Sequence, residues 1–250
     1  MPMRLTRAVK ALLIIYFVVF LIQQTVDQFF GGHILELFAL VPSEFFNHHS
    51  IWQLFTYSFL HADVMHLFLN LLMLAFMGGE IEAAWGTARF LRYYFFCATA
   101  GGVFYLLLQL LVWRADVPMV GASGAIYGLL MAYGLIFGER VLLFMMLFPM
   151  KAKHFVWVLA GVEFLSSVFS GRGGLASIAH LGGMAAGFGL LWGRAAWTVA
   201  KRGRAEKLDR EERARRVKNA KLKLVVGGQK KDGPWSVSED DPDDHPKTWH

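Results

Sequence analysis

Two polar residues in otherwise apolar segments, Ser123 and His180, could together carry nucleophilic chemistry. Ser123 lies in the sequence VGASGAIYG, and His180 lies in AHLGGMAAGF. Both segments contain glycines four residues apart, a spacing that lets two helix backbones approach closely, at Gly124, Gly128, Gly183 and Gly187. If the two helices pack together, the neutral imidazole could take the hydroxyl proton of the serine. The pair would then act as nucleophile and general base.

A nucleophilic serine also needs hydrogen-bond donors for the oxyanion that develops on the substrate. His66 and Asn70 are four residues apart in HADVMHLFLNLLM, so they project from the same face of a helix. The backbone N–H of Ser123 is a third candidate, because amides at the start of a helix have no intrahelical acceptor. The sequence therefore predicts three donors for the oxyanion.

Each of these residues also has a structural interpretation. Serines in helices commonly bond a carbonyl of their own helix, and His180 could simply bond Ser123 or a backbone carbonyl where small-residue helices pack. Spacing alone leaves both interpretations open. For Glu163, in the fifth apolar segment, a hydrogen bond to a neighbouring helix is the preferred interpretation.

The residue pattern argues against two other kinds of site. GASGA resembles the nucleophile elbow G-x-S-x-G, but it ends in Ala125 and no strand precedes it. His61 and His66 are five residues apart, and Asp63 does not complete an H-E-x-x-H zinc motif. We therefore expect neither a metal site nor a cofactor.

The composition of the chain indicates a multi-pass membrane protein. Of the 250 residues, 56% are hydrophobic and 18% are charged, whereas an average soluble domain has about 25% charged residues. The apolar residues form long runs, and a run of about 18 or more can span a bilayer. Six spans are predicted, at residues 11–30, 64–84, 88–113, 120–139, 153–170 and 174–198. The first is interpreted as a retained anchor, because it is too long for a signal peptide and lacks a small-residue cleavage site.

The connections between the spans predict an orientation in the membrane. Residues 31–60 mix His and Glu with Phe, Leu and Trp, which predicts an amphipathic first loop in the membrane interface. Residues 141–150 are apolar but too short to cross a bilayer, so we expect them at the cytoplasmic interface. Nine Lys and Arg fall on the side of the N-terminus and two, Arg114 and Arg172, on the other side. Since cytoplasmic loops carry the positive excess, both termini are predicted to be cytoplasmic.

The charge pattern divides the chain into three parts. These are a basic cytoplasmic N-terminus at 1–10, a six-helix domain at 11–199 and a charged cytoplasmic tail at 200–250. Most of the net charge of +6 comes from the tail, which has fourteen Lys and Arg against ten Asp and Glu, so nucleic-acid binding is not expected. The basic part of the tail could be a helix attracted to anionic lipid. The preferred interpretation is a solvated helix followed by disorder.

Taken together, the motifs resemble those of the rhomboid intramembrane serine proteases. The resemblance rests on GASG, a tyrosine four residues after the serine, AHLGG and HxxxN, in the family's order, and it covers residues 10–198. It implies an all-α membrane protein, a six-transmembrane-helix rhomboid-like bundle with an interfacial first loop. It also implies an endopeptidase that cuts transmembrane segments of other proteins at or near the extracytoplasmic membrane face, with a Ser-His dyad.

The resemblance also implies a role for each site residue. Ser123 would be the nucleophile and His180 the general base. The Ser123 N–H, His66 and Asn70 would form the oxyanion hole, and Gly121 and Ala122 would shape the site. Tyr127 would orient the His180 ring. His61 would be a further histidine near the site, and Glu82 would have a structural role. The family's Trp-Arg pair in the first loop is replaced here by Trp52-Gln53, so the contacts attributed to the arginine must differ.

The expected partners are transmembrane protein substrates and the lipid bilayer, without nucleic acid. Substrates with weak helix formers near the cut are expected, because a helix must unwind to expose its carbonyls. The predicted location is a bacterial inner membrane, since no organelle-targeting segment is evident. An inactive rhomboid-like scaffold is the alternative, although such relatives lack the serine or the histidine. A transporter would require internally repeated halves with broken helices, and the sequence has none that stand out.

Overall fold

The computed structural model describes residues 5–113, 115–144, 148–169 and 174–226. By its internal contacts the chain forms two compact units, Met1–Ala195 and Ala196–His250, which we describe separately. Parts of four predictions lie outside the described residues. These are the first residues of the basic N-terminus, the two arginines predicted on the outer side, residues 145–147 of the segment predicted at the cytoplasmic interface, and the tail from residue 227 onward.

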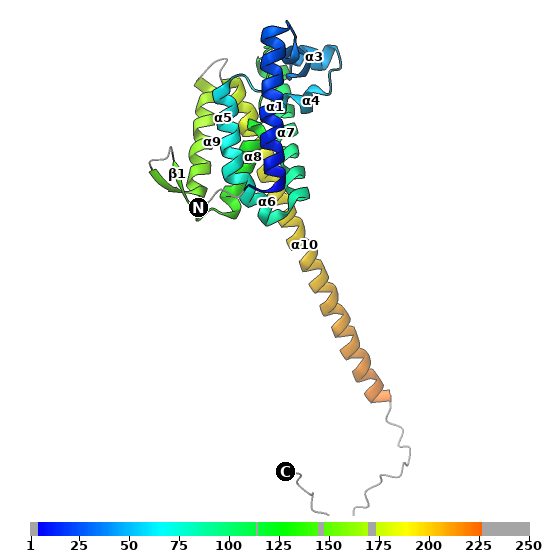
Figure 1. Cartoon of the computed structure of the whole chain (residues 1–250). Coiled ribbons are helices and arrows are strands. Elements are labelled where there is room, and N and C mark those ends of the chain that lie inside the picture. Colours follow the sequence, from blue (N-terminus) through cyan, green and yellow to red (C-terminus); the bar gives the residue numbers. More distant parts are fainter. Residues whose placement is uncertain (1–4, 114, 145–147, 170–173, 227–250) are drawn as a thin grey trace, which may run out of the picture. The chain divides into compact units, whose positions relative to one another are not determined.

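Long apolar helices make up most of the first unit. Four of them are long and apolar enough to cross a membrane, at Arg7–Phe29, Val64–Trp85, Thr87–Val112 and Ala152–Phe169. The first is α1 (Arg7–Phe29) and the last is α9 (Ala152–Phe169). The second consists of α5 (Val64–Met73), a π-helical turn at Leu74–Gly78 and α6 (Gly79–Trp85). The third consists of α7 (Thr87–Leu108) and a π-helical turn at Gln109–Trp113. Figure 1 shows α1, α5, α7 and α9 as long helices running in similar directions.

The prediction of a helical membrane bundle is confirmed in this coarser form, but six spans are not established. Helix α8, Ser123–Ile136, has 14 residues, fewer than the 17 or so that usually cross a bilayer. Helix α10 extends from Gly174 to Val226, far beyond the predicted end of the sixth span. Helix length and composition therefore support several spans without fixing their number.

The surface of α1 explains why this helix belongs in a membrane. Its buried side chains recur every three or four residues, at Ala8, Val9, Leu12, Tyr16 and Phe20. The opposite side is also apolar, and Ile14 is 63% exposed in the structure. A helix that is apolar all round is stable where lipid covers the outer side. The larger hydrophobic core of the unit joins this stripe to buried side chains of α5–α9 and to Met184 of α10. A second, smaller core includes Leu40 of the first loop and Tyr105 of α7.

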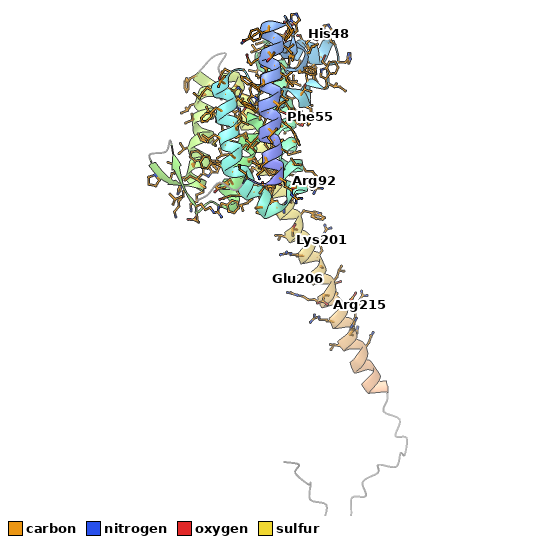
Figure 2. The ribbon with its side chains drawn as sticks, in the orientation of Figure 1. His48, Phe55, Arg92, Lys201, Glu206 and Arg215 are labelled. Atoms are coloured by element: carbon orange, nitrogen blue, oxygen red, sulfur yellow. The ribbon has the colours of Figure 1, made fainter. Side chains whose placement is uncertain are left out.

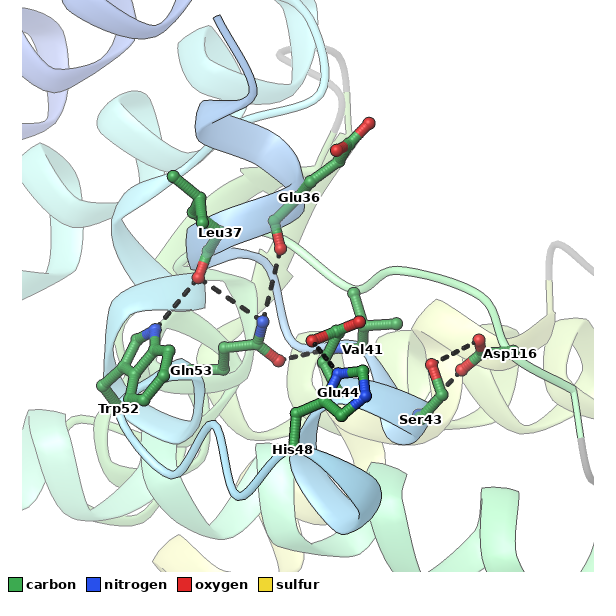
Figure 3. Close-up of polar contacts among 9 residues, drawn as sticks. All are labelled: Glu36, Leu37, Val41, Ser43, Glu44, His48, Trp52, Gln53 and Asp116. Carbon is green, nitrogen blue, oxygen red and sulfur yellow. Dashed lines mark hydrogen bonds and ion pairs between the residues drawn. The ribbon is translucent and has the colours of Figure 1, made fainter.

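The first loop is built from short helices. They are α2 (Ile34–Phe38), α3 (Pro42–Asn47), α4 (Gln53–Thr56) and a 3-10 turn at Tyr57–Phe59. Buried Gln53 joins them (Figure 3): its Nε2 donates to the carbonyl oxygens of Glu36 and Leu37, each at 3.4 Å, and its Oε1 accepts from Val41 N at 3.1 Å. The neighbouring Trp52 also donates to the Leu37 carbonyl, at 3.0 Å. The Gln53 amide thus binds three backbone groups of the first loop, at the position where the resemblance would place an arginine.

Two short strands, β1 (Val141–Phe144) and β2 (Phe148–Lys151), pair as an antiparallel hairpin. The sequence analysis assigned no secondary structure to residues 141–150. Just before the hairpin, Glu139 forms ion pairs with Lys151 and Lys153. Hydrogen bonds from the two ammonium groups lower the pKa of the Glu139 carboxyl to about 2. The hairpin therefore begins and ends in a cluster of charges.

The second unit consists, in its described part, of the charged end of α10. All described side chains from Ala196 to Asn219 are exposed, and Figure 2 shows Lys201, Glu206 and Arg215 along this stretch. The predicted helix in the basic part of the tail is present up to Val226. An exposed helix is consistent with both interpretations of the tail, a solvated helix and a helix lying on anionic lipid.

A buried carboxylate fixes the beginning of α1. Glu82 of α6 accepts from the backbone N–H groups of Ala8 and Val9, each at 3.1 Å. Its side chain also accepts from Thr6 Oγ1 and from Thr87 Oγ1, the latter at 2.6 Å. The first amides of a helix have no intrahelical acceptors, so Glu82 replaces the missing partners and ties α1 to α6.

Substituting Glu82→Ala should lower the free energy of unfolding by about 2–4 kcal/mol, because two buried amides and two hydroxyls lose their acceptor. The measurement is reversible unfolding in mixed detergent micelles, with the exposed Glu206→Ala substitution as the control. An unchanged stability of Glu82→Ala would show that water replaces the carboxylate.

Candidate active site

The segment before Ser123 is held in place by the first loop. Met119 and Leu40 exchange two backbone hydrogen bonds, of 2.9 and 3.0 Å, and Gly121 N donates to Tyr57 O at 2.9 Å. Earlier in the same connection, Asp116 accepts hydrogen bonds from the Ser43 amide and hydroxyl at 2.9 and 2.6 Å (Figure 3). The loop thus fixes where α8 begins, and α8 begins at Ser123.

Gly121 must be a glycine for two reasons. Its φ of +119° lies in a region that side chains rarely adopt. A Cβ at this position would also lie 2.6 Å from Cε1 of His66. The backbone before Ser123 and the His66 ring are therefore in direct contact, as a candidate oxyanion site requires.

Glycines bring α8 and α10 into backbone contact. A Cβ on Gly183 would lie 2.1 Å from the carbonyl oxygen of Gly124, and one on Gly101 of α7 would lie 3.0 Å from Ala179 O. Next to this contact, Gly128 faces the Cys97 side chain, which a Cβ would approach to 2.5 Å. The predicted packing of the two stripes is thus present at Gly183, which lies against Gly124, whereas Gly187 lies against Tyr93 of α7.

This close approach places Ser123 and His180 side by side. His180 Nε2 and Ser123 Oγ are 2.7 Å apart, a hydrogen-bond distance. The Tyr127 ring, one turn after Ser123, lies parallel to the imidazole with centroids 4.3 Å apart and an angle of 7° between the planes. The tyrosine thus restricts the imidazole plane, while Nε2 faces the serine.

Glu163 of α9 occupies the other side of His180. Its Oε2 lies 3.1 Å from His180 Nδ1, within ion-pair distance but not aligned as a hydrogen bond, and its Oε1 accepts from the Tyr127 hydroxyl. Both side chains are largely buried, with 12% of the Glu163 side chain exposed and 18% of the His180 side chain. The sequence analysis placed Glu163 in a hydrogen bond to a neighbouring helix but not at the site. The signal available was the carboxylate itself, since ionisable residues in spans usually mark functional sites.

The three predicted oxyanion donors lie in different surroundings. The Ser123 amide is the first of α8 and therefore has no acceptor within the helix. The His66 ring contacts the Gly121 backbone, as described above. The buried Asn70 amide donates to the His66 carbonyl at 2.9 Å, which occupies one of its two N–H groups.

His61 lies behind His66 and is fully buried. Their rings meet edge to face with centroids 5.2 Å apart. Burial and the nearby His66 lower the pKa of His61 to about 4, so its imidazole is neutral at ordinary pH. Gln23 of α1 holds the His61 backbone, donating to its carbonyl at 2.8 Å and accepting from its amide at 3.2 Å. His61 therefore supports the position of His66 by packing.

The described part of the chain contains no group of three or more His, Cys, Asp or Glu side chains that could hold a metal ion. A hydroxyl in contact with an imidazole, beside unsatisfied donors, can perform acyl transfer.

Comparison with known proteins identifies the family of this chain. Residues 48–197 match the Rhomboid domain, and this stretch contains every candidate site residue. RHOMBOID-like protein 1 of Arabidopsis thaliana is 40% identical over 92 residues, 37% of this chain and 22% of that protein. Rhomboid-like protease 3 of Toxoplasma gondii is 33% identical over 96 residues, 38% of this chain and 35% of that protein. Inactive RHOMBOID-like protein 8 of Arabidopsis thaliana is 32% identical over 82 residues, 33% of this chain and 22% of that protein.

The helical fold, the arrangement around Ser123 and the domain match define a rhomboid-type membrane protein. The chain belongs to the rhomboid family. The aligned parts cover about a fifth to a third of the length of these relatives, whose names include both a protease and an inactive member. All three are eukaryotic, so the bacterial location and the cytoplasmic termini stay predictions.

Substituting Gly183→Ala should separate α8 from α10, because the new Cβ would overlap the Gly124 carbonyl and neither backbone can yield locally. We expect a loss of about 1–3 kcal/mol in the free energy of unfolding, as for other overpacked positions. Gly189→Ala on the same helix is the control, since nothing lies within 4 Å of its Cβ position. Equal melting temperatures for the two variants would contradict the close approach.

Proposed function

We propose that this chain is an intramembrane serine endopeptidase, with Ser123 as nucleophile and His180 as general base. The observation that carries the proposal is the 2.7 Å separation of Ser123 Oγ and His180 Nε2. Family membership supports it, because rhomboids are generally serine intramembrane proteases. The imidazole stacked on Tyr127 is already oriented toward the hydroxyl, which reduces the entropy cost of reaching the reactive geometry.

The proposed reaction proceeds in two steps. His180 Nε2 takes the Ser123 proton as Oγ attacks the substrate carbonyl, and the same proton then passes to the departing amine as the acyl-enzyme forms. Water then attacks the ester, again with His180 as base, and releases Ser123 and the new carboxylate. The oxyanion of both steps would be bound by the Ser123 amide, His66 and Asn70. Each such donor can contribute about 3–4 kcal/mol to transition-state stabilisation.

The proposed substrates are transmembrane segments of other proteins, entering from the bilayer. Peptide hydrolysis needs water, so the polar residues would line a cavity open to the extracytoplasmic side. In this arrangement 11–199 would be the protease domain, with 1–10 and 200–250 on the cytoplasmic side. The location would be a bacterial inner membrane, with the bilayer as the second partner and no cofactor, metal or nucleic acid.

A scaffold that binds membrane proteins without cutting them is the second candidate. The observation in its favour is that one of the relatives reported above is named an inactive rhomboid-like protein. This chain retains both a serine and a histidine in contact, which a scaffold does not require.

Substituting Ser123→Ala should abolish cleavage while leaving folding intact, because it removes one oxygen atom. His180→Ala should lose activity to a similar extent, since nucleophile and base act as a unit. The measurement is cleavage of a labelled single-pass membrane substrate in liposomes, alongside the melting temperature of each variant.

Cleavage by the wild-type chain alone would support the protease. Undiminished cleavage by the Ser123→Ala variant would refute the nucleophile assignment. No cleavage by a folded wild-type chain with several substrates would favour the scaffold.

A further inference from the structure

Glu163 is a carboxylate buried among apolar helices that the proposed two-residue mechanism does not use. Its side chain is 12% exposed and comes from α9, whereas Ser123 and His180 come from α8 and α10. Burying a carboxylate is costly unless hydrogen bonds or opposite charge replace its water. Three helices thus meet at one imidazole, and the third contributes a carboxylate.

The partners of the two carboxylate oxygens define what Glu163 can do. The Tyr127 hydroxyl donates to Oε1, and this fixes the carboxylate in its rotamer. The other oxygen, Oε2, lies 3.1 Å from His180 Nδ1. A small rotation of either group would align an Nδ1–H···Oε2 hydrogen bond, because the distance is already that of such a bond.

The proton on His180 must be on Nδ1 for the imidazole to act as a base toward Ser123. A neutral imidazole has one N–H, and the nitrogen without it is the acceptor. If Nδ1 carries the proton, Nε2 is free to accept from Ser123 Oγ at 2.7 Å. A carboxylate can only accept, so its place beside Nδ1 selects this tautomer and stabilises the imidazolium that forms during the reaction.

We propose that Glu163 is a positioning residue that holds the His180 proton on Nδ1, so that Nε2 is the nitrogen that accepts from Ser123. The inference rests on the proposed function of Ser123 and His180. Tyr127 acts twice in this arrangement, with its ring against the imidazole and its hydroxyl on the carboxylate. The titratable groups around His180 are then Glu163 from α9, Tyr127 from α8 and, farther away, His66 from α5.

Glu163→Gln is the decisive substitution, because it keeps the shape and replaces an acceptor with an amide. The amide N–H₂ can donate to Nδ1, which would move the proton to Nε2 and prevent that nitrogen from accepting. The corresponding Asp→Asn change in a soluble serine protease lowers kcat by about 10⁴. In this buried, partly aligned geometry we expect kcat/KM to fall at least about tenfold for Glu163→Gln, with partial recovery for Glu163→Asp.

A comparison of kcat with KM separates positioning from mere packing. The tautomer of His180 affects only the chemical step, so kcat should fall in Glu163→Gln while KM stays near the wild-type value. In Glu163→Asp, which keeps an acceptor beside Nδ1, kcat should recover in part. Glu82 is a second buried glutamate, and Glu82→Gln is the matched control: it should lower the melting temperature without lowering kcat.

Two outcomes would overturn the inference without touching the proposed function. One is a wild-type kcat in Glu163→Gln, and the other is a change in KM alone, in both cases with Ser123→Ala inactive. A readout independent of cleavage is the ¹⁵N NMR spectrum of histidine-labelled full-length protein in liposomes, with His180 assigned by His180→Gln. We expect Nδ1–H in the wild type and a shift toward Nε2–H in Glu163→Gln. The same tautomer in both would refute the role of Glu163 even if the chain cleaved nothing.

Discussion

The site depends on how closely the backbones of α8 and α10 approach each other. Gly183 lies so near the Gly124 carbonyl that a Cβ there would be 2.1 Å from the oxygen. Lipid is as apolar as leucine, so helices in a membrane gain little from burying large side chains and associate instead where small residues allow backbone contact. The contact sets the spacing of Ser123 and His180, and without it neither Tyr127 nor Glu163 could reach the imidazole.

Three carboxylates at contacts between helices, Glu80, Glu82 and Glu163, each lie against specific donors. Glu82 holds the start of α1, and Glu80 accepts from Tyr133 and from Arg140 at the hairpin end of α8. Glu163 accepts from Tyr127 and lies against His180. Unpaired, such groups would cost several kcal/mol in an apolar surrounding. Two of the carboxylates therefore join helices, whereas the third also joins a helix to the reacting imidazole.

The sequence predicted some of these features because they are local. Glycines four residues apart predicted the packing of the Ser123 and His180 segments, and runs of apolar residues predicted several membrane helices. The role of Glu163 could not be read in the same way, because it depends on the rotation of α9 about its own axis. Spacing within one segment does not specify that rotation. The hairpin after Glu139 was missed for a similar reason, since a short apolar run does not distinguish a strand from an interfacial loop.

The central claim is that Ser123 is an activated nucleophile and that His180 activates it. The most direct measurement is labelling of the full chain in liposomes with a fluorophosphonate, followed by intact-mass and peptide mass spectrometry. The account predicts one adduct, on Ser123, in the wild type and none in a folded His180→Ala variant. An adduct on another residue, equal labelling without His180, or no adduct on folded wild-type protein would contradict it.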